Sequence, residues 1–206
     1  MVVSPLQLSV VVLVAFAIVR PAVAVEEPAF EIVEADGIME LRRYAPLLVA
    51  ETEVAGEFAD AGNAAFRVLF DYISGANDAR AKIAMTAPVV QQPTDVAVAE
   101  RSGSGWRVGF VVPSDFDRAT VPGPADPRVS IREVPERLVV AVRFTGRWTA
   151  DRFEQHQRLA EAWSADHGYE VVGVPVWARY NPPFTPWFLR RNEVLLPVRP
   201  VRVPSG

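Results

Sequence analysis

His156 and His167 are the two histidines of the chain, and cysteine is absent. The missing thiols exclude disulfides, iron–sulfur clusters, thiolate zinc sites and cysteine nucleophiles. On one continuous helix, a rise of ~1.5 Å per residue would place the two imidazoles ~16 Å apart, so they cannot bind one metal ion together. The sequence therefore excludes a histidine-rich metal centre, and His167, beside Gly168, is expected to cap a helix end.

Catalytic motifs of the common enzyme classes are also missing. The sequence has no Gly-x-Ser-x-Gly elbow, no His-Glu-x-x-His, no phosphate-cradling glycine loop and no dinucleotide fingerprint. Its 25 acidic and 21 basic residues give a net charge of -4, which leaves no basic excess to neutralise a phosphate backbone. We therefore expect a binding protein rather than an enzyme, with no nucleic-acid partner.

The N-terminal 24 residues have the pattern of an export signal. An apolar run from Leu6 to Val19 is followed by Ala22-Val23-Ala24, a small-residue cleavage site. The run, at about 14 residues, is shorter than the ~20 that span a bilayer. We expect cleavage after Ala24 and a mature periplasmic or secreted chain without a stable transmembrane span. An uncleaved membrane anchor is the alternative, because no Lys or Arg precedes the run.

The rest of the chain, 25–206, is predicted to form one domain of short elements. Half of the residues are hydrophobic, and 18 prolines and 12 glycines are spread along the chain. Helical periodicity predicts two helices, 57–74 and 150–167, which Gly75 and Gly168 follow as terminating residues; Thr149 can cap the second. Alternating or continuous apolar runs predict strands at 30–34 and 38–44 (joined by Asp36-Gly37), 47–54, 82–91, 106–112, 129–134, 138–144, 171–180 and 193–198, with a mobile loop at 95–105.

The two halves of this region repeat at ninety positions. Leu48-Val49-Ala50 matches Leu138-Val139-Val140, and the same spacing pairs Gly56 with Gly146, Phe58 with Trp148 and Leu69 with Leu159. A repeat of this length indicates a duplicated half-domain. The expected fold class is α+β, with an antiparallel sheet closed into a distorted β-barrel and two helices packed against it.

Several segments carry a family resemblance through their order and spacing. They are Asn63-Ala-Ala-Phe66, Tyr72-Ile-Ser-Gly75, Lys82-Ile-Ala-Met-Thr-Ala-Pro-Val89, Val112-Pro-Ser114, Val121-Pro122, Asp126-Pro-Arg-Val129 and Tyr180-Asn-Pro-Pro-Phe-Thr-Pro-Trp-Phe-Leu-Arg-Arg-Asn-Glu-Val194. Together they resemble the SOUL haem-binding protein family over roughly residues 26–198.

The resemblance implies the fold of the related bacterial effector-binding domains, which take small ligands in a groove between two halves. It also implies non-covalent binding of haem or another porphyrin. Members of this family differ in whether they bind haem and in whether a side chain ligates the iron. The alternatives are a module for another apolar or cationic small molecule in the groove, or a small-molecule hydrolase.

The first expected helix has an apolar arc wide enough for a ligand. At 100° per residue the arc covers about 200°, whereas core packing asks for little more than ~100°. A ligand, the 95–105 loop or a partner chain is expected to cover the excess. Gly62 would let a flat ring approach the backbone, or would serve tight helix–sheet packing. The haem-binding candidates on this helix are Gly62, Phe66, Arg67, Leu69 and Phe70.

Basic residues are candidates to meet the two haem propionates, because guanidinium forks suit carboxylates. Surface ion pairing is the competing role in a chain with 25 acidic residues. The basic candidates are Arg67, Arg80, Lys82, Arg190 and Arg191.

His156 is a candidate axial ligand to the iron, because it projects onto the apolar face of the second helix with Phe153 and Trp163. We favour the alternative role, a packing histidine bonded to a carbonyl. Met85 and Tyr44 are other possible ligands. We expect haem to be held mainly by apolar contact, without a protein ligand to the iron.

Glu193 resembles, in its position, the acidic residue that lies in the groove of the effector-binding relatives. With Tyr180 it forms the alternative candidate site, for a cationic ligand or for acid–base chemistry. The structural alternative is that Glu193 stabilises the barrel by accepting hydrogen bonds from arginines or the backbone.

Overall fold

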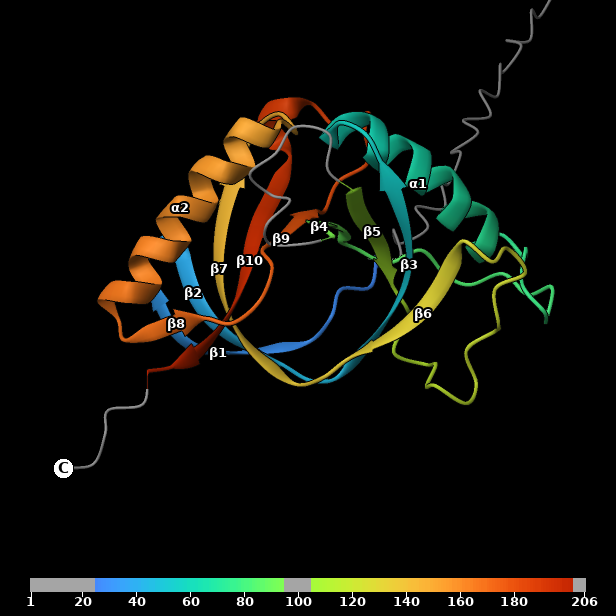
Figure 1. Ribbon diagram of the computed structural model, residues 1–206, viewed down its shortest axis with the longest axis horizontal. Coiled ribbons are helices and arrows are strands. Elements are labelled where there is room, and N and C mark those ends of the chain that lie inside the picture. The colour runs from blue at the N-terminus through green and yellow to red at the C-terminus, as the bar shows by residue number, and fades with distance from the viewer. Residues whose placement is uncertain (1–24, 95–104, 202–206) are drawn as a thin grey trace, which may run out of the picture.

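The computed structural model describes residues 25–94 and 105–201, and within them a ten-stranded sheet forms the frame (Figure 1). Its strand order is β1-β2-β7-β10-β9-β4-β5-β3-β6, with β8 also pairing with β10, and all these pairs are antiparallel. The strands are β1 Phe30–Asp36, β2 Met39–Tyr44, β3 Leu47–Ala55, β4 Val89–Pro93, β5 Gly105–Val111, β6 Val129–Val134, β7 Arg137–Thr145, β8 Tyr169–Val171, β9 Val176–Arg179 and β10 Arg191–Pro200.

The sheet is curled into an open half-barrel, and two helices lie on the same side of it, α1 Phe58–Ile73 and α2 Ala150–Asp166 (Figure 1). Helix α1 packs on β3 and β5, and α2 packs on β7, β8 and β10. A short 3-10 helix, η2 Trp187–Leu189, precedes β10. The expected α+β class, with a barrel-like antiparallel sheet and two packed helices, is confirmed, and the barrel is half open between β1 and β6.

The ninety-residue spacing between equivalent positions holds for the strands but increases by one residue in the helices. Strands β3 and β7 are related by ninety positions, and Gly56 and Gly146 follow them with φ angles of 117° and 134°, which favour glycine. Toward the ends of the helices, however, burial repeats at ninety-one positions, since Leu69, Tyr72 and Ile73 correspond to Ala160, Trp163 and Ser164. Ala160, not Leu159, is therefore the buried counterpart of Leu69. The expected equivalence of Leu69 and Leu159 is therefore wrong by one residue.

Two expected strands are shorter than predicted. The run 171–180 is divided into β8 and β9 by residues 172–175, where Pro175 has no N–H to donate to a ladder. The run 82–91 joins the sheet mainly at β4, and before that strand only an isolated bridge between Glu26 and Thr86 is formed. The expected export signal, residues 1–24, and most of the 95–105 loop lie outside the described residues.

The main core lies between the helices and the sheet. Its centre is aromatic: Phe58 of α1 meets Phe153 of α2 at 5.6 Å and Trp177 of β9 at 5.1 Å between ring centroids. A smaller cluster on the opposite sheet face includes Tyr44 and Leu195. In the described part of the chain, no helix combines the length and apolar character needed to cross a membrane.

Candidate functional site

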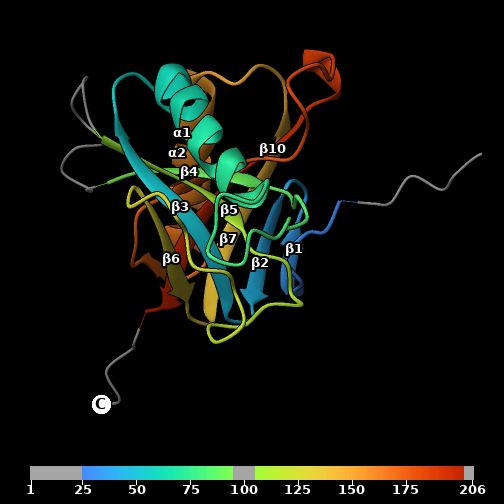
Figure 2. The ribbon, with the colours of Figure 1, turned by 90° about the vertical axis from the view of Figure 1, so that its right-hand side faces the viewer.

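A cavity of about 520 Å³ opens beside α1. Its walls come from α1, from the residues that lead into β4, from the end of β9 and from the proline-rich segment after it. Figure 2 shows α1 in front, with the segment that leads into β10 at the same end of the molecule. We call this cavity the α1 groove; it is lined by Val25, Gly62, Asn63, Phe66, Arg67, Phe70, Met85, Thr86, Ala87, Val89, Trp148, Arg179, Tyr180, Asn181, Pro182, Pro183 and Phe184.

The wall formed by α1 is the part of its wide apolar arc that the core leaves uncovered. Phe66 and Phe70 are 37% and 49% exposed, and their rings stack with centroids 5.9 Å apart. Phe66 also packs edge-on against Phe110 of β5 at 5.2 Å, which fixes its orientation. Phe184, which also lines the groove, is 85% exposed. Together these rings offer flat apolar surfaces of the kind that hold a small-molecule ligand.

Arg179 lies in the floor of the groove, where helix and sheet approach closely. Its Nη2 donates a hydrogen bond to Gln91 Oε1 at 3.1 Å, and its guanidinium lies 5.4 Å from the Trp148 ring centroid. A Cβ at Gly62 would come within 2.9 Å of Gln91 Oε1 and 3.1 Å of the guanidinium nitrogens. Gly62 therefore serves tight helix–sheet packing, although it also borders the groove.

The guanidinium of Arg179 has no counter-ion in the described chain. It forms no ion pair with a described carboxylate, and its Nε is buried without a hydrogen-bond acceptor. Burial lowers the pKa of Arg179 to about 10, so the side chain still carries its charge at neutral pH. Arg179 is not among the site residues predicted from the sequence, although alternation in β9 places Trp177 and Arg179 on one face of the strand.

The other basic candidates take different positions. Arg67 lines the groove, whereas Lys82 is exposed outside it. Arg190 donates hydrogen bonds to the carbonyls of Thr185 at 2.8 Å and Pro183 at 2.6 Å. It therefore stabilises the proline-rich segment after β9, which lines the groove. Arg80 has a φ of 50° and does not line the groove.

Two further candidates are also outside the groove. Arg191 is bonded to Glu27 and Glu193, and Leu69 is fully buried in the core. Of the residues predicted for the haem site and for the alternative site, those that line the α1 groove are Gly62, Phe66, Arg67, Phe70 and Tyr180.

Glu193 is the centre of a buried ionic cluster. Its carboxylate accepts hydrogen bonds from Arg42 Nη1 at 2.7 Å, Tyr180 Oη at 2.8 Å and Arg191 Nε at 3.0 Å. Burial raises the pKa of the Glu193 carboxyl, but the hydrogen bond and charge of Arg42, followed by the charge of Arg191 and the Tyr180 hydroxyl, outweigh it and bring the pKa below its ordinary value. Burial and the negative charge of Glu193 raise the pKa of the Tyr180 phenol.

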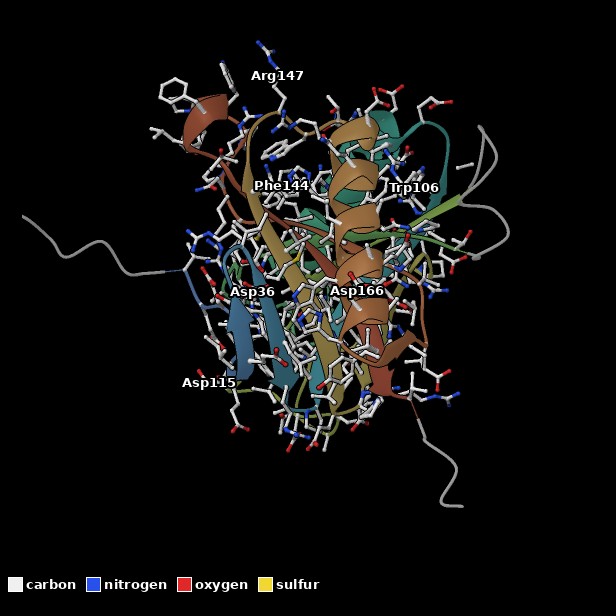
Figure 3. All side chains as sticks on the ribbon, turned by 90° about the vertical axis from the view of Figure 1, so that its left-hand side faces the viewer. Asp36, Trp106, Asp115, Phe144, Arg147 and Asp166 are labelled. Atoms are coloured by element: carbon white, nitrogen blue, oxygen red, sulfur yellow. The ribbon has the colours of Figure 1, made fainter. Side chains whose placement is uncertain are left out.

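Both histidines are engaged in packing on α2. His156 Nδ1 lies 2.6 Å from the Arg152 carbonyl oxygen, and its ring stacks on Phe144 at 3.8 Å; Figure 3 shows Phe144 on β7 beside α2. His167 Nδ1 lies 2.8 Å from the Trp163 carbonyl oxygen and follows the helix as its C-terminal cap. Neither histidine lines the α1 groove. Among the described residues, no group of three His, Cys, Asp or Glu side chains could hold a metal ion.

Of the other possible iron ligands, Met85 lines the groove and Tyr44 does not. Tyr44 is buried on the opposite sheet face, where its hydroxyl accepts a hydrogen bond from Arg42. A smaller cavity of about 210 Å³ lies on that face, with Tyr44, Arg137 and Leu195 in its lining. The two cavities therefore lie on opposite sides of the sheet.

Comparison with known proteins gives matches over most of the chain. A family model described as "SOUL heme-binding protein" matches residues 25–197. Heme-binding protein 1 of Xenopus tropicalis is 30% identical over 164 residues, which cover 78% of this chain and 84% of that protein.

Solved structures share the fold at low sequence identity. The C-terminal domain of EcmrR has a TM-score of 0.63 at 15% identity, with 79% of this chain and 98% of that chain covered. A hydrolase from Listeria innocua has a TM-score of 0.55 at 9% identity, covering 78% of this chain and 91% of its own. At these identities the likeness is one of fold alone.

Proposed function

Because the chain belongs to the SOUL haem-binding protein family, we propose that it binds haem or a related porphyrin in the α1 groove. The observation that carries this proposal is the stacked pair Phe66 and Phe70, which the core leaves exposed in a groove that Phe184 also lines. A volume of about 520 Å³ is within the range of small-molecule and cofactor sites, ~300–1,000 Å³.

The residues of the groove fit an apolar disc better than a ligated metal. Among the described residues, the lining offers aromatic rings and prolines but no histidine or carboxylate, and Met85 is the one thioether in it. Bound haem would supply a large flat ring for the rings of Phe66 and Phe70 to pack against, while Arg67 at the groove would meet a propionate. We therefore propose binding through the ring and its carboxylates, independent of the iron.

The geometry weighs against the two alternative functions. A cationic ligand would meet Arg67 and Arg179 in the groove, whereas Glu193 is fully buried among its partners. A hydrolase built on Glu193 and Tyr180 would need a base and an acid that titrate near neutral pH. The pKa of Glu193 is lowered and that of Tyr180 is raised, so neither group is poised for that work.

Absorption titration of the purified protein with haem and with metal-free protoporphyrin tests the proposal, using Phe66→Asp as the variant and Phe188→Asp as its control. A charge in the α1 wall should lower affinity for both porphyrins at least tenfold. Phe188 is 58% exposed but outside the groove, so its variant should bind as the wild type does. Circular dichroism verifies the fold of each protein. Unchanged affinity in folded Phe66→Asp would contradict the proposed site.

We also propose that the protein acts outside the cytoplasm, on the basis of the apolar run Leu6–Val19 and the following Ala22-Val23-Ala24. The intact mass of the protein from its own host should correspond to a chain that begins at Val25. A mass that retains residues 1–24 would instead indicate an anchored or cytoplasmic protein.

A further inference from the structure

The floor and the walls of the α1 groove differ in their chemistry. The walls present Phe66, Phe70 and Pro182, but the floor presents the charged guanidinium of Arg179. No aspartate or glutamate is part of the lining. A cation enclosed by apolar surface is costly unless an anion neutralises it, and the described chain supplies none for Arg179.

Two buried hydrogen-bond donors also lack acceptors at this floor. Arg179 Nε and Trp148 Nε1 are both buried without a partner, and both residues line the groove. Two neutral amides are near Arg179 in the described chain: Gln91 accepts one hydrogen bond from it, and Asn192, whose Oδ1 is also buried without a partner, is paired with it across β9 and β10. Amide oxygens can accept hydrogen bonds but do not neutralise the charge.

The guanidinium is held in a fixed position. The backbone of α1 at Gly62 lies against it, and Gln91 Oε1 accepts a hydrogen bond from Nη2. The ring centroids of Trp148 and Phe58 lie 5.4 and 5.8 Å from its Cζ. Because these contacts order the guanidinium before any ligand arrives, a carboxylate that binds there loses little free energy to ordering of the arginine itself. A guanidinium and an indole N–H are both hydrogen-bond donors that carboxylate oxygens can accept from.

We propose that Arg179 and Trp148 form an anion site at the floor of the α1 groove, which receives a carboxylate of the ligand and makes the groove selective for apolar carboxylates. This assignment uses the groove of the proposed function but does not depend on haem. For a porphyrin it means that one propionate points inward to Arg179. The carboxylate would be the counter-ion that the protein itself does not provide.

Matched pairs of acid and neutral ligands test this selectivity. Fluorescence titration compares pyrenebutyric acid with pyrenebutanol, and protoporphyrin with its dimethyl ester. The acid of each pair should bind at least tenfold more tightly to the wild type. Arg179→Gln, which retains an amide that can bond to Gln91, should remove that preference while affinity for the neutral ligands stays within about threefold. Arg158→Gln makes the same change in net charge at an exposed position on α2 and should keep the preference.

The outcomes separate this inference from the proposed function. Equal affinity for acid and neutral ligands in the wild type, an acid preference that persists in folded Arg179→Gln, or no binding of either pyrene ligand would each overturn the anion site. Failure of both porphyrins to bind, with the pyrene preference intact and dependent on Arg179, would overturn porphyrin binding and leave the anion site supported.

Discussion

Arg179 and Glu193 are buried charges on neighbouring strands, yet they are neutralised to different extents. Glu193 has hydrogen bonds from two arginines and a tyrosine, whereas Arg179 has a single neutral acceptor in Gln91. Sequence could place each residue on a strand, but Arg42 lies 151 positions from Glu193. Which arginine meets which acid depends on strand pairing between distant segments, and a single sequence does not encode that pairing locally.

Replacement of Glu193 by Gln should destabilise the protein strongly. The change removes the fully buried carboxylate that pairs with the guanidinium of Arg42, which keeps only its contact with the part-exposed Glu40. The loss of one partner of a buried ion pair costs roughly 3–5 kcal/mol. Urea unfolding at pH 7 measures the free energy of unfolding. Glu53→Gln is the control, because its pair with Arg107 is exposed, and it should cost at most about 1 kcal/mol. A similarly small loss of unfolding free energy in both variants would show that Glu193 does not stabilise the fold through its buried ion pair.

The stability gained from Glu193 should also depend on pH. Its pKa is lower in the folded state than the ordinary value of 4.5, so its contribution is fully present above about pH 4.5 and is lost as the pH falls through the folded pKa. The difference in unfolding free energy between wild type and Glu193→Gln should therefore shrink in acid. Urea unfolding repeated from pH 7 downward measures it, and a difference that stays constant would show that the carboxylate charge is unimportant.

Removal of the charge at Arg179 should stabilise the protein without ligand. A buried cation with no counter-ion costs free energy, and about 1–2 kcal/mol regained by Arg179→Gln corresponds to a rise in Tm of roughly 2–8 °C for a domain of this size. Differential scanning calorimetry at neutral pH measures this change. A fall in Tm would mean that the contacts of the guanidinium with Gln91 and Trp148 outweigh the cost of its burial.

At the scale of elements, helix α1 has two apolar faces with different neighbours. One face, with Leu69 and Tyr72, is buried in the core, and the other, with Phe66 and Phe70, borders the groove. The width of the apolar arc could be predicted from 3.6-residue periodicity alone. The division between the two faces could not, because it depends on where the sheet ends beneath the helix.

Helix α2 presents His156 to Phe144 of the sheet and not to the groove. We therefore expect His156→Ala to leave haem affinity within about tenfold, or ~1.4 kcal/mol, in an absorption titration of the folded variant. Metal-free porphyrin should bind comparably. A much larger loss, together with a collapsed Soret shift, would identify His156 as an iron ligand.

At the scale of the whole molecule, the α1 groove depends on the joining of the two halves. Strand β4 of the first half pairs with β9 of the second, and this pair aligns Val89 with Arg179. The β1–β2 hairpin, the turns after β3 and β7, and the two helices could be predicted from the hydrophobic periodicity, the positions of the glycines and the ninety-residue repeat. The floor of the groove could not, because Arg179 and Trp148 enter it through a pairing between halves that no local pattern specifies.

The most direct test of the central claim, that the α1 groove binds a porphyrin, is an NMR titration of the protein with metal-free protoporphyrin. Ring-current shifts decline steeply with distance from the ring, so they report its position in solution. The largest shifts should fall on the amides of Gly62, Phe66, Phe70 and Phe184, which border the groove. Largest shifts around Tyr44 and Leu195, on the opposite face of the sheet, would contradict the assignment.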